Sequence, residues 1–520
     1  MKNYDLVVIG AGPAGLSAAI EGSRKGMKTI VFDENAKPGG QLFKQIHKFF
    51  GSKEHQAKIR GINIGKKLLE EAEEAGVEVR LNSQVTGLFR NNVVGVFSDG
   101  QMETYYANNM VVATGASERT LPFEGWTLPG VIGAGAAQTM INLHGVRPGD
   151  KILMVGSGNV GLVVSYQLQQ AGCEVVAVID GAPKIGGYGV HAAKLARLGI
   201  SFYLSHTIEK AEGSDHVEGV DIVEVDSSWK PVEGSRKHFD VDVICVAVGL
   251  NPMSQLLRMA GAEMKDAGGL VPVCDEYGET SIPGIFAAGD VAGIEEASSA
   301  MIGGHIAGIA AAYRGGYVTE EEFKEKVRTY KESLAQLRQG MFAVENRGKD
   351  IRETEEGCPV SQNLLKTGHL DSEEVVNYPG VIKKAGVHPV IECTQNIPCN
   401  PCQDACKFGC ISIGSKITSL PIVVKEADCR NCGMCVASCS GQAIFLIDDD
   451  LGDGTATVTM PYEFLPYPEE GTVGKGLDRS GQAVCEATVV SVKTSPAFDK
   501  TALLTVKIPK EYVNIVRFFK

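Results

Sequence analysis

The chain opens on apolar runs separated by a glycine-rich turn, a pattern typical of a βαβ unit. Residues 4–9 form an apolar run of the buried parallel-strand type, which stops at Gly10-Ala-Gly-Pro-Ala-Gly15. An alanine-rich stretch over residues 16–25 predicts a helix, and a second apolar run over residues 28–32 ends at Asp33. A strand, a G-x-G-x-x-G turn, a helix and an acid about twenty residues further on predict a dinucleotide-binding unit.

The same pattern recurs near residue 150. Residues 151–155 (Lys-Ile-Leu-Met-Val) are largely apolar and lead into Gly156-Ser-Gly-Asn-Val-Gly161, which opens a predicted helix that ends at Ala171. A further apolar run over residues 175–179 is followed by Asp180. The predicted fold class is therefore α/β, with two Rossmann-like units.

Each glycine and each acid of these motifs has a physical role. The first glycine allows a tight turn, the second lets the backbone approach a pyrophosphate, and the third lets the helix pack on the strand. A carboxylate at Asp180 can accept a ribose 2′-hydroxyl and would repel a 2′-phosphate, which favours NAD over NADP. Asp180 stands one residue further from its first glycine than Asp33 does, so its register is left open. The residues predicted to bind an NAD-type nucleotide are Gly156, Gly158, Asn159, Val160, Gly161 and Asp180.

The cysteines are concentrated in one stretch. Nine of the fourteen lie between Cys393 and Cys439, which is typical of metal binding rather than of a disulfide framework. One run has the bacterial ferredoxin spacing C-x2-C-x2-C-x3-C, and the other is a looser version with a longer first gap. In such pairs the fourth cysteine of each run ligates the other cluster. We predict two [4Fe–4S] clusters, one held by Cys393, Cys399, Cys402 and Cys439 and the other by Cys406, Cys429, Cys432 and Cys435.

Zinc stays open as the alternative metal, because zinc ribbons also use Cys-x-x-Cys pairs, although eight interleaved cysteines favour iron–sulfur. Cys410 has no place in either set and is interpreted as a packing residue. Residues 341–385 are polar and weakly patterned, which is typical of a linker. Beyond residue 448, period-two stretches such as residues 456–460 and 503–508 predict a small β module.

Composition narrows the function classes. The 520 residues are 44% hydrophobic and 22% charged, which fits three or four globular domains. A net charge of −13 argues against a general nucleic-acid binder. The sequence contains no run of about 18 apolar residues, the length that a membrane span needs. No secretory segment follows Met1, so we expect a cytoplasmic protein.

Further motifs within residues 1 to about 335 resemble those of a known family. Pro38-Gly-Gly-Gln41, Val111-Val-Ala-Thr-Gly115 and residues 284–290 follow the first turn in the order seen in two-dinucleotide flavoproteins. The chain resembles their thioredoxin-reductase-like branch, in which the first unit binds FAD and the inserted second unit binds a nicotinamide nucleotide. The FAD-binding residues that this resemblance implies are Gly10, Gly12, Pro13, Ala14, Gly15, Asp33, Glu34, Gly40, Gln41, Thr114, Gly115, Gly289 and Asp290. The predicted organisation is a split FAD domain (residues 1–117 and 275–340), a nucleotide domain (118–274), a linker (341–385), a ferredoxin-like α+β domain (386–447) and a β module (448–520).

The second domain departs from thioredoxin reductases at its redox cysteines. Ala134 and Ala137 stand where the two thiols would be, so disulfide exchange by this route is excluded. Residues 121–138 are similar to the large subunits of heteromeric amine and imino-acid dehydrogenases, such as sarcosine oxidase alpha, proline and hydroxyproline dehydrogenase, opine oxidase and hydrogen cyanide synthase. This resemblance implies a hetero-oligomer with a second flavin-containing, substrate-oxidising subunit. It also leaves room for a small iron–sulfur subunit and for FMN at a subunit interface.

The combination of cofactors predicts electron transfer. Amine oxidation and nicotinamide chemistry move two electrons, clusters move one, and flavin works in both regimes. We therefore expect an electron-transfer subunit of a dehydrogenase for a secondary amine, imino acid or amino acid, delivering to a nucleotide such as NAD, another adenine nucleotide or another acceptor. Two alternatives stay open. One is a self-contained NAD(P)H:acceptor oxidoreductase, and the other is a docking subunit with structural or sensing clusters.

Overall fold

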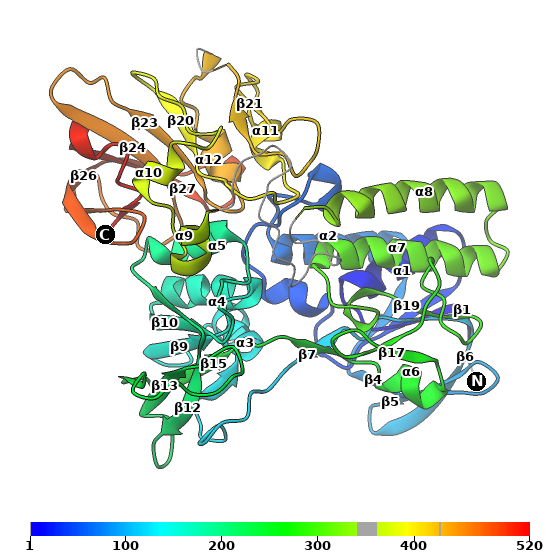
Figure 1. Ribbon diagram of the computed structural model, residues 1–520. Helices are drawn as coiled ribbons and strands as arrows, with labels where there is room; N and C mark the ends of the chain where they lie inside the picture. The colour runs from blue at the N-terminus through cyan, green and yellow to red at the C-terminus, as the bar shows by residue number, and fades with distance from the viewer. Residues whose placement is uncertain (1, 341–360, 426–427) are drawn as a thin grey trace. The chain divides into compact units, whose positions relative to one another are not determined.

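The computed structural model describes residues 2–340, 361–425 and 428–520, and these fall into two compact units (Figure 1). The first unit takes the described residues of 1–46, 54–119 and 249–339. The second takes those of 47–53, 120–248 and 340–520. Each unit is described by itself.

The first unit is built on a mixed sheet in the order β3-β2-β1-β6-β5-β4, with β19 also paired to β6. Strands β1, β2, β3 and β19 pair in parallel, whereas β4, β5 and β6 pair with one another antiparallel. Leu6, Val7 and Val8 of β1 are wholly buried, as expected for a parallel strand covered on both faces. The strands are β1 (Lys2–Ile9), β2 (Thr29–Phe32), β3 (Glu78–Arg80), β4 (Ser83–Phe89), β5 (Val93–Ser98), β6 (Gln101–Val112) and β19 (Ile285–Ala287).

Helices pack closely in this unit because small residues face each other. Helix α1 (Pro13–Arg24) lies beside α7 (Ala297–Arg314), and Cβ atoms added at Gly304 and Gly308 of α7 would collide with the backbone of α1 (Figure 1). Helix α8 (Glu320–Leu337) covers α7, and its predicted start is capped by Thr319, whose side chain accepts the Glu322 N–H. Two more helices belong to this unit, α2 (Gly61–Glu74) and α6 (Gln255–Ala260).

Residues 249–274 also belong to the first unit. Strand β16 (Leu250–Pro252) pairs antiparallel with β7 (Ala116–Glu118), so the chain enters and leaves the inserted domain along one short ribbon. The Arg119 N–H donates to the Gly249 carbonyl at 3.0 Å and continues that ribbon. A small hairpin of β17 (Met264–Asp266) and β18 (Leu270–Pro272) follows.

The second unit contains the second Rossmann-like fold. Its sheet is parallel throughout, in the order β11-β10-β9-β15-β8, and a smaller antiparallel sheet has the order β12-β13-β14. The elements of this fold are β8 (Val131–Gly133), α3 (Ala134–His144), β9 (Lys151–Val155), α4 (Asn159–Gln170), β10 (Glu174–Asp180), α5 (Gly189–Ala196), β11 (Ser201–Leu204), β12 (His206–Glu212), β13 (Gly219–Glu224), β14 (Lys237–Phe239) and β15 (Val243–Val246). The α/β fold class with two such sheets is confirmed.

The cysteine runs and the C-terminal strands share one antiparallel sheet, in the order β20-β23-β24-β27-β26-β25-β28. Strand β20 precedes Cys393 and β23 follows Cys439, so the cysteine runs lie between two neighbouring strands of that sheet. Alternating buried residues of β24 and β27 form its core, as the period-two pattern predicts. The strands are β20 (His388–Ile391), β23 (Ile444–Asp448), β24 (Thr455–Tyr462), β25 (Val473–Leu477), β26 (Ala483–Lys493), β27 (Ala502–Pro509) and β28 (Phe518–Phe519).

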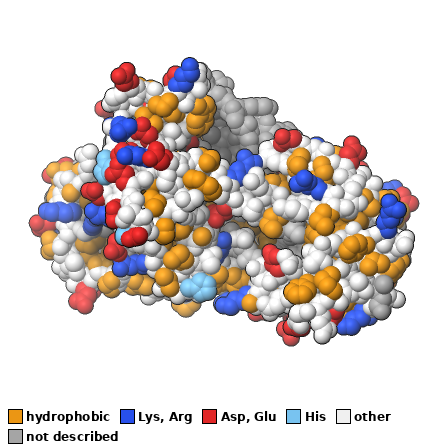
Figure 2. Space-filling model, turned by 90° about the horizontal axis from the view of Figure 1, so that it is seen from below, with side chains coloured by type: hydrophobic (Ala, Val, Ile, Leu, Met, Phe, Trp, Pro, Cys, Tyr) orange, Lys and Arg blue, Asp and Glu red, His pale blue; other side chains and the backbone are white. Residues whose placement is uncertain are grey.

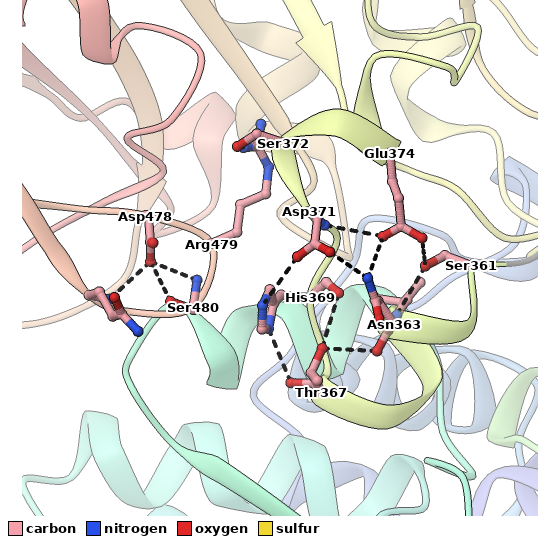
Figure 3. Close-up of polar contacts among 12 residues, drawn as sticks. Ser361, Asn363, Thr367, His369, Asp371, Ser372, Glu374, Asp478, Arg479 and Ser480 are labelled. Atoms are coloured by element: carbon pink, nitrogen blue, oxygen red, sulfur yellow. Dashed lines mark hydrogen bonds and ion pairs between the residues drawn. The ribbon is translucent and has the colours of Figure 1, made fainter.

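The predicted linker holds local structure where the structure describes it, from residue 361 onward. Helix α9 (Gln362–Thr367) is capped by the Ser361 hydroxyl, which accepts the Leu364 N–H at 3.1 Å. Helix α10 (Ser372–Val375) starts at Asp371 with a capping box closed by Glu374 (Figure 3). Four of its apolar side chains form a small buried cluster with Leu420, namely Leu364, Leu370, Val375 and Tyr378. Short polar helices with few apolar positions gave no periodicity from which to predict them.

On the face seen in Figure 2, acidic and basic side chains are interspersed among apolar ones. Among the residues described, no helix combines the length and apolar character needed to cross a membrane.

Candidate functional site

The first glycine-rich turn has the geometry that its motif requires. Gly10 adopts φ +104°, and a Cβ there would collide with the Ala113 carbonyl. A Cβ at Gly15 would collide with the Gly10 carbonyl, so this glycine permits the helix to pack on the turn. At Gly12, by contrast, a Cβ would meet no described atom within 4 Å. The open position is the one at which the backbone of this motif approaches a pyrophosphate.

The Asp33 carboxylate of this site is held in place by backbone hydrogen bonds. Its Oδ2 accepts the Ala11 N–H at 2.7 Å, and its Oδ1 accepts the Asn35 N–H at 2.8 Å. The Gly39 N–H donates to the Ala11 carbonyl at 2.7 Å, which brings the Pro-Gly-Gly-Gln segment onto the turn. A Cβ at Gly40 would lie 2.9 Å from the Gly12 Cα.

The other residues expected at the FAD site take different positions. Gly289 lies against Ala14, because a Cβ there would come within 2.8 Å of the Ala14 Cβ. Thr114 donates its hydroxyl to the Met253 carbonyl at 2.7 Å and thereby holds the strand end beside Gly115. The remaining ones are Pro13 at the first turn of α1, Asp290 in a 3-10 turn (Gly289–Val291), and Glu34 and Gln41, whose side chains are exposed.

Lys44 is a residue of this unit that no sequence motif singled out. It ends the 3-10 turn η1 (Gly40–Lys44) that follows the Gly-Gly pair. Burial lowers the pKa of its ammonium, against the opposing effect of the Glu118 carboxylate. A lysine directly after the apolar pair Leu42-Phe43, in the turn that follows Pro-Gly-Gly, was the available signal.

The second turn repeats the first in detail. Gly156 adopts φ +109° against the Ala247 carbonyl, and Gly161 packs on the Gly156 carbonyl. A Cβ at Gly158 would meet no atom of the described residues within 4 Å. The Asn159 side-chain oxygen accepts the Tyr188 N–H at 2.8 Å at the start of α4. Val160, the next residue, is 46% exposed.

A β-bulge resolves the one-residue offset of Asp180. The register of β10 against β9 shifts between Val175 and Ala177, so Val176 is an extra residue in the strand. Asp180 therefore returns to the position that Asp33 has in the first unit. Its Oδ2 accepts the Ser157 N–H at 2.7 Å, the same length as the corresponding bond at Asp33.

Four cysteines form an inner group, defined as Cys393, Cys399, Cys402 and Cys439. Three of them, with Phe50, pack around Tyr188 and Val190 of the second Rossmann-like fold. Burial raises the pKa of each thiol, to about 12 at Cys393. At Cys393, Cys399 and Cys402 the charges of neighbouring sulfurs of the same group add to this rise in pKa. The four thiols are thus close enough to influence one another.

The other four predicted ligands form an outer group, defined as Cys406, Cys429, Cys432 and Cys435. Burial raises the pKa of Cys435, followed by the charges of Cys432 and Cys429. Cys432 is exposed, unlike any member of the inner group. Cys406 joins the group through Cys410, which is buried and lies near both Cys406 and Cys429.

The two runs are related by an internal repeat. Helix α11 (Pro401–Ala405) precedes Cys406, and α12 (Met434–Ser438) precedes Cys439. The Cys410 N–H donates to the Cys406 sulfur at 3.2 Å, and the Ala443 N–H donates to the Cys439 sulfur at 3.4 Å. Cys410 therefore occupies the position of Ala443 in the other run, where a small packing residue stands. Strands β21 (Ile411–Ser412) and β22 (Ile422–Val423) pair antiparallel between the runs.

Buried charges near the inner group were not predicted from the sequence. The Glu392 carboxylate is held at 2.6 Å by the guanidinium groups of Arg479 and Arg517. Burial opposes its charge, but these two cations lower the pKa of Glu392 to about 2. Lys194 of α5 and Arg197, which directly follows that helix, are also buried, and Arg197 donates to the Gln442 carbonyl at 3.2 Å. Glu392 is 87 residues from Arg479 and 125 residues from Arg517 in the sequence, so no local pattern could have predicted these ion pairs.

A seven-residue loop, 47–53, belongs to the second unit although its neighbours in sequence belong to the first. Lys48 donates to the Ala437 carbonyl at 2.6 Å, at the end of α12. The Phe49 carbonyl accepts the Ser440 hydroxyl at 2.6 Å, directly after Cys439. The Gly51 carbonyl accepts the Asn400 N–H at 3.0 Å, directly after Cys399. The loop thus lines the inner group, and the Lys48-Phe49-Phe50 stretch was its only sequence signal.

Several curated relatives of the chain are subunits of enzymes. The chain is 31% identical over 328 residues to an opine oxidase subunit of Agrobacterium tumefaciens, which covers 59% of this chain and 65% of that protein. It is 28% identical over 369 residues to the HcnB component of the hydrogen cyanide synthase of Pseudomonas aeruginosa, covering 66% and 79%. It is 28% identical over 327 residues to the alpha component of the sarcosine oxidase of a Corynebacterium strain, covering 60% and 33%. The chain thus spans just under two thirds of the opine oxidase relative. The resemblance predicted from residues 121–138 is confirmed.

Solved structures share the fold. L-proline dehydrogenase from P. horikoshii superposes with a TM-score of 0.50 at 22% identity, covering 64% of this chain and 59% of that one. Thioredoxin reductase from T. acidophilum superposes with a TM-score of 0.51 at 21% identity, covering 61% and 100%. At these identities the likeness concerns the fold alone.

A family profile matches the part of the chain that contains both glycine-rich turns. The profile of the pyridine nucleotide-disulphide oxidoreductases matches residues 4–316, more than half of the chain. That family implies FAD and nucleotide binding, and together with the relatives it makes the protein a flavin-dependent oxidoreductase. The chain belongs to the pyridine nucleotide-disulphide oxidoreductase family.

Proposed function

We propose that this chain is the FAD and iron–sulfur electron-transfer subunit of a multi-subunit dehydrogenase that oxidises a secondary amine, an imino acid or an amino acid. The observation that carries the proposal is the pair of four-cysteine groups in the unit that also holds the second nucleotide fold. Electrons would pass between flavin, clusters and a nucleotide or another acceptor.

The first unit fits FAD. Gly12 leaves room for a pyrophosphate at the N-terminus of α1, where backbone N–H groups and the helix dipole favour phosphate. Asp33 is held by the Ala11 and Asn35 N–H groups, so its carboxylate is already oriented when a ribose arrives. We assign the FAD contacts to the residues that the resemblance to two-dinucleotide flavoproteins implies.

The cysteine groups fit iron–sulfur clusters better than zinc. A tetrahedral zinc with bonds of about 2.3 Å brings its four sulfurs to about 3.8 Å from one another. Among the described residues, no three cysteine sulfurs lie within 4.8 Å of one another. A four-iron cluster is larger than a single ion and holds its thiolates further apart. We therefore assign the inner group to one cluster and the outer group to the other.

When bound, flavin would exchange electron pairs with an organic substrate and single electrons with the clusters. The chain's own residues position these groups. The N–H groups of Cys410 and Ala443 donate to the Cys406 and Cys439 sulfurs, and such bonds stabilise charge on a ligating thiolate. The loop 47–53 closes the inner group on the side of Cys399 and Cys439.

The relatives support a partner subunit, since each of the three named above is one component of an enzyme. We propose that a second flavin-containing subunit carries the substrate pocket, with a small iron–sulfur subunit and interface FMN as further components. Co-purification under anaerobic conditions, followed by flavin, iron and sulfide analysis of each polypeptide, tests this directly. Isolation of this chain alone, with full activity toward an amine, would contradict the proposal.

A self-contained NAD(P)H:acceptor oxidoreductase is the second candidate, and the bonding of Asp180 favours it. Anaerobic titration separates the two functions. Bleaching of flavin and clusters by NADH alone supports the second candidate, whereas bleaching only by an amine or imino acid with the partner present supports the first. Clusters that never change oxidation state would indicate a structural or sensing role.

A further inference from the structure

A tryptophan lies beside the acid of the second nucleotide fold. The Trp229 side chain is 68% exposed, although indole is among the side chains that gain most from burial. Its ring rests on Gly181, the residue directly after Asp180. A Cβ at Gly181 would come within 2.6 Å of the Trp229 Cη2, so the absence of a side chain there makes room for the ring.

The turn that carries Trp229 is tightly held. The Trp229 N–H donates to the Asp226 carbonyl at 2.9 Å, and the Asp226 Oδ1 accepts the N–H groups of Ser228 at 2.8 Å and Lys230 at 3.0 Å. Trp229 itself adopts φ +62°, a left-handed conformation that costs a bulky residue energy. Strained conformations of this kind concentrate at binding sites, where the surroundings enforce them.

The turn is also tied to the segment after Asp180. The Ser205 N–H donates to the Ala182 carbonyl at 3.0 Å, and the Ser205 carbonyl accepts the Val225 N–H at 2.7 Å. The Ala182 N–H donates to the Asp180 Oδ1 at 2.9 Å. One continuous set of hydrogen bonds therefore positions the indole relative to the carboxylate.

We infer that Trp229 is a stacking platform for the adenine of a nucleotide bound to the second Rossmann-like fold. In such folds the acid at the end of the second strand accepts the adenosine ribose hydroxyls, so the base lies next to the residue that follows the acid. That neighbour is Gly181, and the exposed indole above it offers a π-face to a purine. The ligand class is an adenosine nucleotide without a 2′-phosphate, because the Asp180 carboxylate would repel one.

The inference rests on the second fold holding a nucleotide, and it is independent of the clusters. The test is calorimetric titration of the anaerobically purified full chain with ADP, ADP-ribose, NAD⁺ and 2′,5′-ADP. Trp229→Ala is expected to weaken ADP and ADP-ribose binding about tenfold or more, whereas Trp229→Phe should retain most of the affinity. The 2′-phosphorylated ligand should bind poorly to every variant.

A matched control uses the second tryptophan of the chain. Trp126 is 43% exposed, and Trp126→Phe leaves Trp229 as the sole indole. ADP is expected to quench the fluorescence of that variant and to bind it with unchanged affinity. The thermal unfolding midpoint of Trp229→Ala should stay close to that of the unmodified chain, because the side chain buries little area.

Two results would overturn the inference, and they separate its failure from that of the nucleotide site. If ADP binds the unmodified chain and Trp229→Ala leaves the affinity unchanged or tightens it, the indole is no platform, although the nucleotide site stands. If no adenosine nucleotide binds the unmodified chain, both the platform and the nucleotide role of the second fold are wrong.

Discussion

The inner and outer cysteine groups carry similar sequence runs in different surroundings. In both runs the fourth cysteine accepts an N–H four residues further on, at 3.2 Å for Cys406 and 3.4 Å for Cys439. The inner group packs against Phe50, Tyr188 and Val190, which come from parts of the chain far away in sequence. Two members of the outer group, Cys406 and Cys435, pack in a core cluster with Leu503, whereas Cys432 is exposed.

Charge separates the two groups as well. Burial raises the pKa of Cys439, and the Lys194 ammonium opposes that effect. Burial likewise lowers the pKa of Arg197, and the charge of Cys439 is among the influences that raise it. Near the outer group, Asp428 instead adds to the raised pKa of Cys410. Two buried cations, Lys194 and Arg197, thus act on Cys439 of the inner group, where the buried Glu392 carboxylate is already paired with two arginines. Near the outer group the Asp428 carboxylate acts on Cys410, and the spacing of the cysteines does not encode this difference.

Removing one ligand from each group is the strongest way to test the comparison. We expect Cys399→Ser and Cys432→Ser each to lose about half of the iron and acid-labile sulfide, because each removes one of two clusters. Iron analysis and the EPR spectrum of the reduced protein measure this. Cys399→Ser should also destabilise the fold more than Cys432→Ser does, since Cys399 is partly buried against an apolar cluster whereas Cys432 is exposed. Equal iron content in both variants and in the unmodified chain would refute the ligand assignment.

The buried carboxylate beside the inner group should give the next largest effect. Glu392→Gln leaves Arg479 and Arg517 without their counter-charge, which typically costs about 3–5 kcal/mol. Denaturant unfolding of the anaerobic full chain measures the loss. The exposed pair of Lys507 and Asp453 is the control, and Asp453→Asn should change the free energy of unfolding far less, because solvent screens this pair. If the two variants lost a similar free energy of unfolding, burial would not be the reason why the Glu392 ion pairs stabilise the fold.

The same carboxylate predicts an acid-dependent loss of stability. The folded-state pKa of Glu392 is depressed to about 2, below its usual value of about 4.3 in an unfolded chain. A depressed pKa contributes stability that is fully present above pH about 4.3 and is lost as the pH falls toward about 2. Unfolding free energies measured across that window should fall more steeply for the unmodified chain than for Glu392→Gln. Parallel pH profiles would show that the carboxylate is not ionised in the folded state.

The buried cations should make the inner cluster easier to reduce, because reduction adds negative charge to it. Lys194→Met is expected to lower the inner midpoint potential by about 59 mV, which is a tenfold change for a one-electron couple. The outer potential should stay nearly unchanged. Redox titration followed by EPR measures both, with the exposed Lys407→Met as control. If Lys194→Met shifted the midpoint potentials of both clusters equally, the buried cations would not act selectively on the inner cluster.

The motifs formed by neighbouring residues could be predicted from the sequence, whereas the contacts that these motifs make with distant parts of the chain could not. Glycine-rich turns, strand-end acids and the spacing of the cysteines depend on neighbouring residues, so both Rossmann-like units could be predicted. The register of Asp180 could not, because the bulge at Val176 is set by pairing with β9. The placement of residues 47–53 against Cys399 and the shared sheet of β20 and β23–β28 depend on contacts distant in sequence, which no local pattern contains.

The smallest expected effect concerns Cys410, the ninth cysteine of the stretch. The internal repeat aligns it with Ala443, and its backbone N–H donates to the Cys406 sulfur at 3.2 Å, as the Ala443 N–H does to the Cys439 sulfur at 3.4 Å. Cys410→Ala should therefore keep the full iron content and change the outer potential by a few millivolts at most, since the hydrogen bond to sulfur survives the substitution. The matched variant Cys406→Ala should lose the outer cluster. If instead Cys410→Ala loses iron and Cys406→Ala does not, the chain uses Cys410 as its fourth outer ligand, and the repeat between the two runs is only approximate at the metal.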